Sequence, residues 1–164
     1  MNILATIPQR IFANIIDSLV LLIFTFPFSL ISLDIPCIFF LYSIAVNCSY
    51  YTYFLSSSTQ ATIGQKFLNI HIIKCNNNKI NIQTAFDRTI SEFLCPVIIM
   101  ILTQIVNIFH KSYFIVIVAL LFQMITLAMY VYWYLIAIFS HKRQTIHDIL
   151  FDTIVVIGKF SNKE

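Results

Sequence analysis

The stretch YFIVIVALLFQMITLAMYVYWYLIAIF, residues 113–139, decides the fold class of this sequence. It contains no charged side chain, and it is longer than the about 20 apolar residues that a helix needs to cross a bilayer. A run of this length and composition indicates a transmembrane helix.

The composition of the whole chain agrees with that stretch. Of the 164 residues, 59% are hydrophobic and 10% are charged, and the mean hydropathy is +0.86. A soluble domain carries about 25% charged residues, so these values exclude disorder and argue against a soluble globular domain. The net charge of +3 is too small for a nucleic-acid-binding face, and the expected partner is the lipid bilayer.

Three further apolar runs accompany the first. The run at 11–33 would measure about 34 Å as a helix, enough to cross a hydrocarbon core of about 30 Å. Its Asp17, and the lack of an A-x-A site after it, argue against a signal peptide. We therefore predict an all-α integral membrane protein with about four transmembrane helices, which form a single domain over residues 1–164. The predicted spans are 11–33, 35–55, 93–109 and 113–139.

The third run is the shortest of the four. Only His110, Lys111 and Ser112 separate 93–109 from 113–139. Two full spans are one interpretation of this region, and a re-entrant hairpin followed by one span is the alternative.

Residues 56–92 form the one sizeable polar stretch of the sequence. Within it, the Ile-rich segments 67–74 and 79–82 flank Asn76-Asn77-Asn78, a typical turn sequence. This pattern predicts a small β-hairpin-like insert between the second and third spans.

Two helix signals lie outside the apolar runs. Thr84, with Asp87 three residues later, predicts the start of a helix. Residues 145–157 predict a C-terminal amphipathic segment along the membrane surface, with its last residues extended. We find no internal repeat and no low-complexity tract in the sequence.

The lysines and arginines predict the orientation in the membrane. With the N-terminus inside, the outside loops hold Lys111 alone. The inside segments then hold Arg10, Lys66, Lys74, Lys79, Arg88, Lys142, Arg143, Lys159 and Lys163. This bias predicts that both termini and the 56–92 loop are cytoplasmic.

Asp17 is the acidic residue deepest in a predicted span. A carboxylate at that depth costs about 2.5–3.5 kcal/mol on insertion scales, so it should face the bundle interior and have a partner. Arg10, Asn14 and Asp17 follow one helical face, and Arg88 or His147 are the expected partners of Asp17. Two interpretations stay open: an ion or proton site, or a structural contact that fixes helix packing.

The sequence holds no pattern of an enzyme. It lacks a nucleophile–base arrangement, a glycine-rich phosphate loop and a dinucleotide fingerprint. His147, Asp148 and Asp152 share one predicted turn, but no second cluster completes a ligand set. The 4 cysteines form no CxxC pair. We expect no enzymatic activity, no cofactor and no metal site.

Three separated segments together resemble the RDD family of small bacterial membrane proteins, which is named for one arginine and two aspartates. The segments are RIFANIID at 10–17, TIGQKFLNI at 62–70 and KRQTIHDIL at 142–150. The resemblance makes Arg10, Asp17 and Asp148 the signature residues. Asn14, Gly64, Arg88 and His147 are supporting positions. The chain departs from the family pattern at Gln65, Asn69 and the pair Phe151-Asp152.

The resemblance implies a multi-pass protein of the bacterial cytoplasmic membrane with a suspected transport role. Transport of small ligands, or exchange of monovalent cations for protons, would make Asp17 the ion-binding carboxylate, with Asp148 as a gate or relay. So small a chain would then function as a homo-oligomer. The alternative is a non-transporting scaffold or assembly factor, in which Arg10, Asp17 and Asp148 form a structural lock.

Overall fold

The structure is a computed structural model of the chain, and it describes residues 3–31 and 36–158. Four of its helices are long and apolar enough to cross a membrane. They are α1 (Ile7–Ile31), α2 (Pro36–Ser56), α4 (Ile82–Ile108) and α5 (Tyr113–Phe139). The predicted class, a helical membrane protein with four spans, is confirmed.

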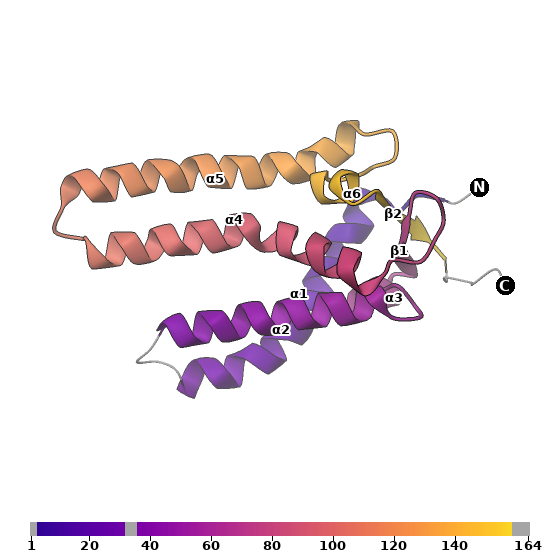
Figure 1. Cartoon of the computed structure of the whole chain (residues 1–164), viewed down its shortest axis with the longest axis horizontal. Coiled ribbons are helices and arrows are strands. Elements are labelled where there is room, and N and C mark those ends of the chain that lie inside the picture. The colour runs from indigo at the N-terminus through magenta and orange to yellow at the C-terminus, as the bar shows by residue number, and fades with distance from the viewer. Residues whose placement is uncertain (1–2, 32–35, 159–164) are drawn as a thin grey trace.

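The short elements gather at one end of the long helices, near both chain ends (Figure 1). They are α3 (Ile63–Phe67), β1 (Ile70–Lys74), α6 (Ile146–Leu150) and β2 (Thr153–Ile157). The turn between α4 and α5 lies at the opposite end (Figure 1). A buried cluster that includes Leu55, Ile72 and Val155 joins the sheet to the helix ends.

The third span begins earlier than the hydropathy suggests. Helix α4 starts at Ile82, where the prediction was residue 93. Its N-cap is Asn81, whose side chain accepts a hydrogen bond from the Thr84 backbone N–H at 2.9 Å, so the prediction that Thr84 caps the helix was wrong. The first turns are polar and therefore do not register as an apolar run. One continuous helix of 27 residues favours a full span over a re-entrant hairpin.

The sheet has a different second strand from the predicted hairpin. Strand β1 pairs antiparallel with β2 from the C-terminal segment, with Ile72 opposite Val155. The segment 79–82 forms no strand; instead the Ile80 N–H donates to the Gln60 side chain at 3.1 Å. Because a side chain already satisfies this backbone group, 79–82 does not pair with β1.

The C-terminal segment 145–157 is likewise only partly helical. Helix α6 ends at Leu150, and Asp152 has a φ of 51°, which stops the helix before β2 begins. The extended last residues are confirmed, and most of them are buried in the sheet.

The chain folds as two similar halves, a repeat that the sequence analysis missed. Thr62 and Thr145 each cap a five-residue helix through a capping box. A residue with positive φ follows each helix, Asn69 at 54° and Asp152 at 51°, and a strand comes next. Each of these features in the second half lies 83 residues after its counterpart.

The sheet register has the same symmetry. Ile72 and Val155 are counterparts 83 residues apart, and they are also the central pair of the ladder. A local two-fold pseudo-axis therefore passes through this pair and relates α3 and β1 to α6 and β2.

Candidate functional site

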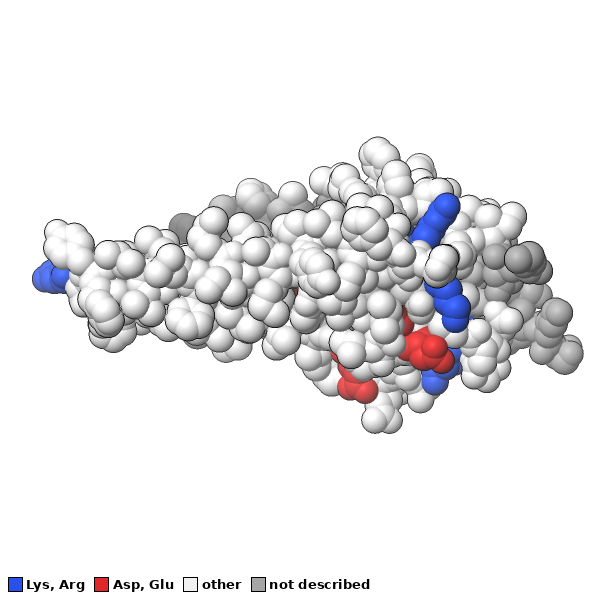
Figure 2. Space-filling model, turned by 90° about the horizontal axis from the view of Figure 1, so that it is seen from above, with Lys and Arg blue, Asp and Glu red and all other residues white. Residues whose placement is uncertain are grey.

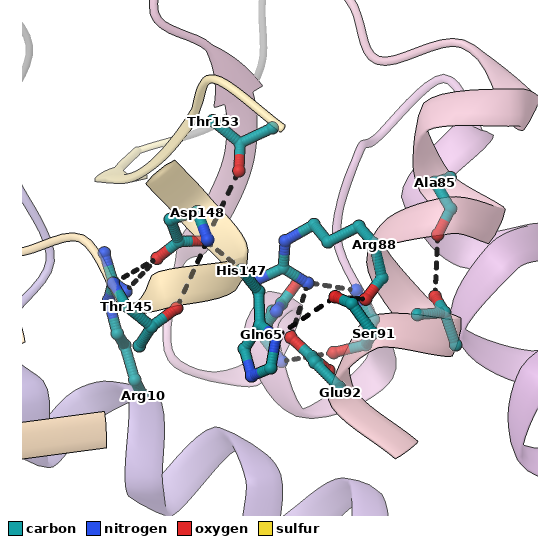
Figure 3. A network of polar contacts seen from close by, with 12 residues as sticks. Arg10, Gln65, Ala85, Arg88, Ser91, Glu92, Thr145, His147, Asp148 and Thr153 are labelled. Carbon is teal, nitrogen blue, oxygen red and sulfur yellow. Dashed lines mark hydrogen bonds and ion pairs between the residues drawn. The ribbon is translucent and has the colours of Figure 1, made fainter. Parts of the chain in front are cut away.

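Asp148 lies at the centre of a buried ion-pair network (Figure 3). Its side chain is fully buried on α6, where it completes the capping box with Thr145. Arg10 from α1 donates to one carboxylate oxygen at 2.6 Å, and Arg88 from α4 donates to the other at 2.9 Å. The Thr153 hydroxyl adds a bond of 3.3 Å. One carboxylate thus ties α6 to two spanning helices.

The arginines keep the Asp148 carboxylate charged. Burial alone would raise its pKa, but the positive charges of Arg88 and Arg10 and their hydrogen bonds outweigh burial and lower the pKa to about 2. Asp148 is therefore a charged ion-pair partner at neutral pH, and it lies buried inside the protein.

Asp17 is fully buried in a separate contact. One of its oxygens accepts from the Tyr50 hydroxyl at 2.6 Å and from the Gly64 backbone N–H at 2.7 Å. The other oxygen accepts from the Thr62 hydroxyl at 2.6 Å. Asp17 thereby fastens the start of α3 to α1 and α2.

The expected partners of Asp17 are elsewhere. Arg88 pairs with Asp148 and Glu92, and His147 faces α4, so the prediction that either of them pairs with Asp17 was wrong. Of the three signature residues, the structure brings Arg10 and Asp148 together.

Gly64 permits the close approach of α3 to α1. A Cβ at this position would lie 2.2 Å from the Ala13 carbonyl oxygen and 3.0 Å from the Asp17 side chain. Any side chain would therefore push α3 away from the Asp17 carboxylate. Steric crowding thus explains why this supporting position is a glycine in this chain.

His147 occupies the place in α6 that Gly64 holds in α3. It is buried, its Nδ1 lies 3.1 Å from the Ser91 hydroxyl, and its ring packs edge-on against Trp133 at 5.1 Å. Burial, together with the nearby charge of Arg88, lowers its pKa from 6.5 to about 4. His147 is therefore neutral at physiological pH.

Glu92 is a member of the network that the sequence analysis did not single out. It pairs with Arg88 at 2.8 Å, one helical turn further along α4. The i, i+4 spacing of opposite charges beside an apolar run was the available signal.

A small cavity of about 60 Å³ adjoins this network. The long helices contribute Arg10, Asn14, Tyr51, Arg88, Glu92 and Tyr134 to its lining, and the short elements contribute Gln65, Ile72, Thr145 and Val155. Asp17 does not line it. Over residues 3–31 and 36–158, no group of three His, Cys, Asp or Glu side chains is placed to hold a metal ion.

Comparison with known proteins identifies a single family. The model of the RDD family matches residues 4–152, a range that includes Arg10, Asp17, Arg88 and Asp148. No curated protein and no solved structure matches the chain.

Proposed function

The chain belongs to the RDD family, and on that basis we propose that it is a non-transporting membrane scaffold or assembly factor. In this proposal Arg10, Asp17 and Asp148 form a structural lock. The lock fastens the short helices and the sheet to the spanning helices. Under this proposal the chain has no catalytic role.

The observation that carries the proposal is the saturation of both aspartates. Asp17 and Asp148 are fully buried, and both oxygens of each carboxylate already accept hydrogen bonds from the protein. A carboxylate that exchanges a cation for a proton must release its ligands in each cycle. Here, such a release would break the contacts of α3 or α6. For Asp148, breaking the buried ion pair would cost about 3–5 kcal/mol. For Asp17, release would leave buried hydrogen-bond donors unpaired.

One observation favours transport as a second candidate. Glu92 is an acidic residue that lines the cavity, which lies between the two halves of the chain. Transporters often bind their substrate at such a repeat interface. Under this candidate, cation and proton exchange would pass through Glu92 rather than Asp17.

The proposal also includes the orientation of the chain in the membrane and the membrane in which it lies. The short elements and both chain ends lie together, and the α4–α5 turn with Lys111 lies at the other end (Figure 1). Figure 2 shows most lysines and arginines near the end with the short elements. We infer that this end is cytoplasmic in a bacterial inner membrane, by the positive-inside rule.

Proton flux in proteoliposomes separates the two candidates. A pH-sensitive dye inside the vesicles reports the response to sodium, lithium and potassium pulses for wild type, Asp17→Asn and Glu92→Gln. The scaffold proposal predicts no cation-driven flux from folded wild-type protein and a lower melting temperature for Asp17→Asn. The matched control, Asp87→Asn, changes an exposed acid of α4 and should melt like wild type. Cation-driven flux that Glu92→Gln abolishes, without loss of folding, would refute the scaffold and support exchange.

A further inference from the structure

Several buried N–H groups around the cavity lack a partner among the described residues. They are Nε and Nη2 of Arg10 and Nε of Arg88. Arg88 as a residue is 6% exposed, and the Arg10 side chain is 13% exposed. A buried donor without an acceptor costs about 1–3 kcal/mol, and more when it is charged. These three N–H donors therefore need acceptor oxygens, which the described residues do not supply.

The free atoms of Arg10 have a definite geometry. Its Nη1 binds Asp148, which leaves the Nε and Nη2 edge of the guanidinium unused. Two parallel N–H groups on one edge form a fork that matches two oxygens of one carboxylate or phosphate group. Water can satisfy single donors, but the fork fits an oxyanion best.

The cavity lies between the two halves and is lined by equivalent residues from each. Ile72 and Val155, counterparts 83 residues apart, both line it. Tyr51 and Tyr134 each lie five residues before the last residue of their helix. This arrangement surrounds one point with guanidinium, hydroxyl and amide groups and with the carboxylate of Glu92, which pairs with Arg88 at 2.8 Å.

The size and position of the cavity restrict the ligand. At about 60 Å³ it is far below a pocket for a drug-sized molecule, which occupies about 300–1,000 Å³. It has room for a few water-sized groups at about 10–15 Å³ each. Helix α1 has 25 residues and measures about 37 Å, more than the about 30 Å of hydrocarbon, so its first turns reach headgroup level.

The cavity also has an exposed margin on α1. Ile11 is 52% exposed, and Asn14 is exposed as well. Helix α2 packs closely on α4, whereas the equivalent pair, α5 and α1, is not closely packed in the described part of the chain. A lipid headgroup can therefore approach from the side between α1 and α5.

We propose that this cavity is a phosphate-binding site, in which the free edge of Arg10 and the Nε of Arg88 hold the oxygens of one phosphate group. The phosphate comes either from a membrane phospholipid that enters between α1 and α5 or from free phosphate. The site uses arginine atoms that do not bind Asp148. The phosphate-binding proposal can therefore be tested independently of the scaffold proposal.

Binding can be measured on the full chain in a maltoside detergent, which contains no phosphate. The probes are dihexanoyl phosphatidylglycerol, dihexanoylglycerol as the phosphate-free control, and inorganic phosphate. Calorimetry gives the affinity. Trp133, the one tryptophan of the chain, precedes the cavity residue Tyr134 and reports binding by its fluorescence.

Glu92→Gln is the decisive variant, because misfolding cannot produce its expected effect. Removing a negative charge beside the cavity should tighten phosphate binding by about fivefold to tenfold. Arg10→Lys keeps the charge but loses the fork and should weaken binding by about tenfold or more. Lys111→Ala, at the far end of the molecule, should leave the affinity unchanged.

Each outcome decides the proposal. Binding of the phospholipid alone supports a lipid site, and binding of inorganic phosphate as well supports a general phosphate site. The proposal is wrong if neither phosphate probe binds folded wild-type protein, or if dihexanoylglycerol binds as tightly as the phospholipid. Weaker phosphate binding by folded Glu92→Gln would also overturn it.

Discussion

At the scale of single residues, the two signature aspartates perform the same task by different means. Asp148 is held by two guanidinium groups, and Asp17 by two hydroxyl groups and one backbone N–H. Asp148 lies in the first turn of α6, and the carboxylate of Asp17 reaches from α1 to the first turn of α3. A negative charge is favourable at the start of a helix. Both carboxylates therefore hold a short helix against the spanning helices.

Gly64→Ala tests the tight contact of α3 with α1. The new methyl group must displace the Ala13 carbonyl or the Asp17 side chain, and overpacking of this kind costs about 1–3 kcal/mol. Chemical denaturation in detergent measures the loss. A double-mutant cycle with Asp17→Ala should show strong non-additivity, because both changes break the same contact; additive losses would contradict this explanation.

His147 should make stability depend on pH. Its pKa falls from 6.5 to about 4 on folding, so the unfolded chain takes up a proton more readily. Stability is then complete above pH 6.5 and falls by up to about 1.4 kcal/mol per pH unit as the pH drops toward 4. Melting curves of wild type and His147→Gln between pH 7 and 4.5 measure this effect.

The matched control for this pH profile is His141→Gln, which changes an exposed histidine. The control should keep the wild-type profile, and His147→Gln should flatten it. An unchanged slope in His147→Gln would assign the pH dependence to another group.

At the scale of the elements, the apolar runs predicted the four spanning helices. They predicted little of the short helices and the sheet, which lie at the end of the molecule that holds the Asp148 network. The α5 span has no charged residue and most of its large apolar side chains are exposed on the surface, so hydropathy alone defines it. The β1–β2 pairing joins residues far apart in the chain, and no local pattern encodes it. Alternation in 67–74 did predict a strand, but the partner depends on tertiary packing.

The repeat could not be recognised from the sequence because few residues are identical between its two copies. Thr62 and Thr145 are identical, but Gly64 corresponds to His147 and Gln65 to Asp148. Backbone conformation is shared at these positions while the side chains differ. The family resemblance found Arg10, Asp17 and Asp148, but it did not say which of them meet.

A cysteine pair tests the strand assignment. In a Cys75→Ser background, Lys74→Cys with Thr153→Cys places two thiols on directly opposite residues. Opposite Cβ atoms in an antiparallel pair lie about 4.5–5.5 Å apart, close to disulfide range, so the pair should oxidise readily. Ile73→Cys with Ile80→Cys represents the hairpin that the sequence suggested. Faster crosslinking of this second pair would contradict the β1–β2 sheet.

At the scale of the whole molecule, two similar halves meet at one end, and the polar residues concentrate where they meet. The central pair of the sheet lies on the pseudo-axis, and the cavity takes equivalent residues from each half. The rest of the molecule presents apolar side chains outward from the four spans. The lock and the cavity thus share one end of a largely apolar protein.

The proposed orientation makes a prediction at this scale. In a cysteine-free background, Lys111→Cys should react in intact cells with a maleimide that cannot cross membranes. Lys66→Cys, within α3 at the other end, should react only after the cells are opened. The reverse pattern would invert the topology.

The most direct test of the structural lock is the free energy of unfolding of Asp148→Asn, measured beside Asp87→Asn in the same detergent. Asp148→Asn removes the negative charge that Arg10 and Arg88 share and leaves Arg88 with Glu92 alone, so the account predicts a loss of about 3–5 kcal/mol. Asp87 is exposed, and its replacement should change stability by no more than about 0.5 kcal/mol. Equal stability of the two variants would contradict the lock.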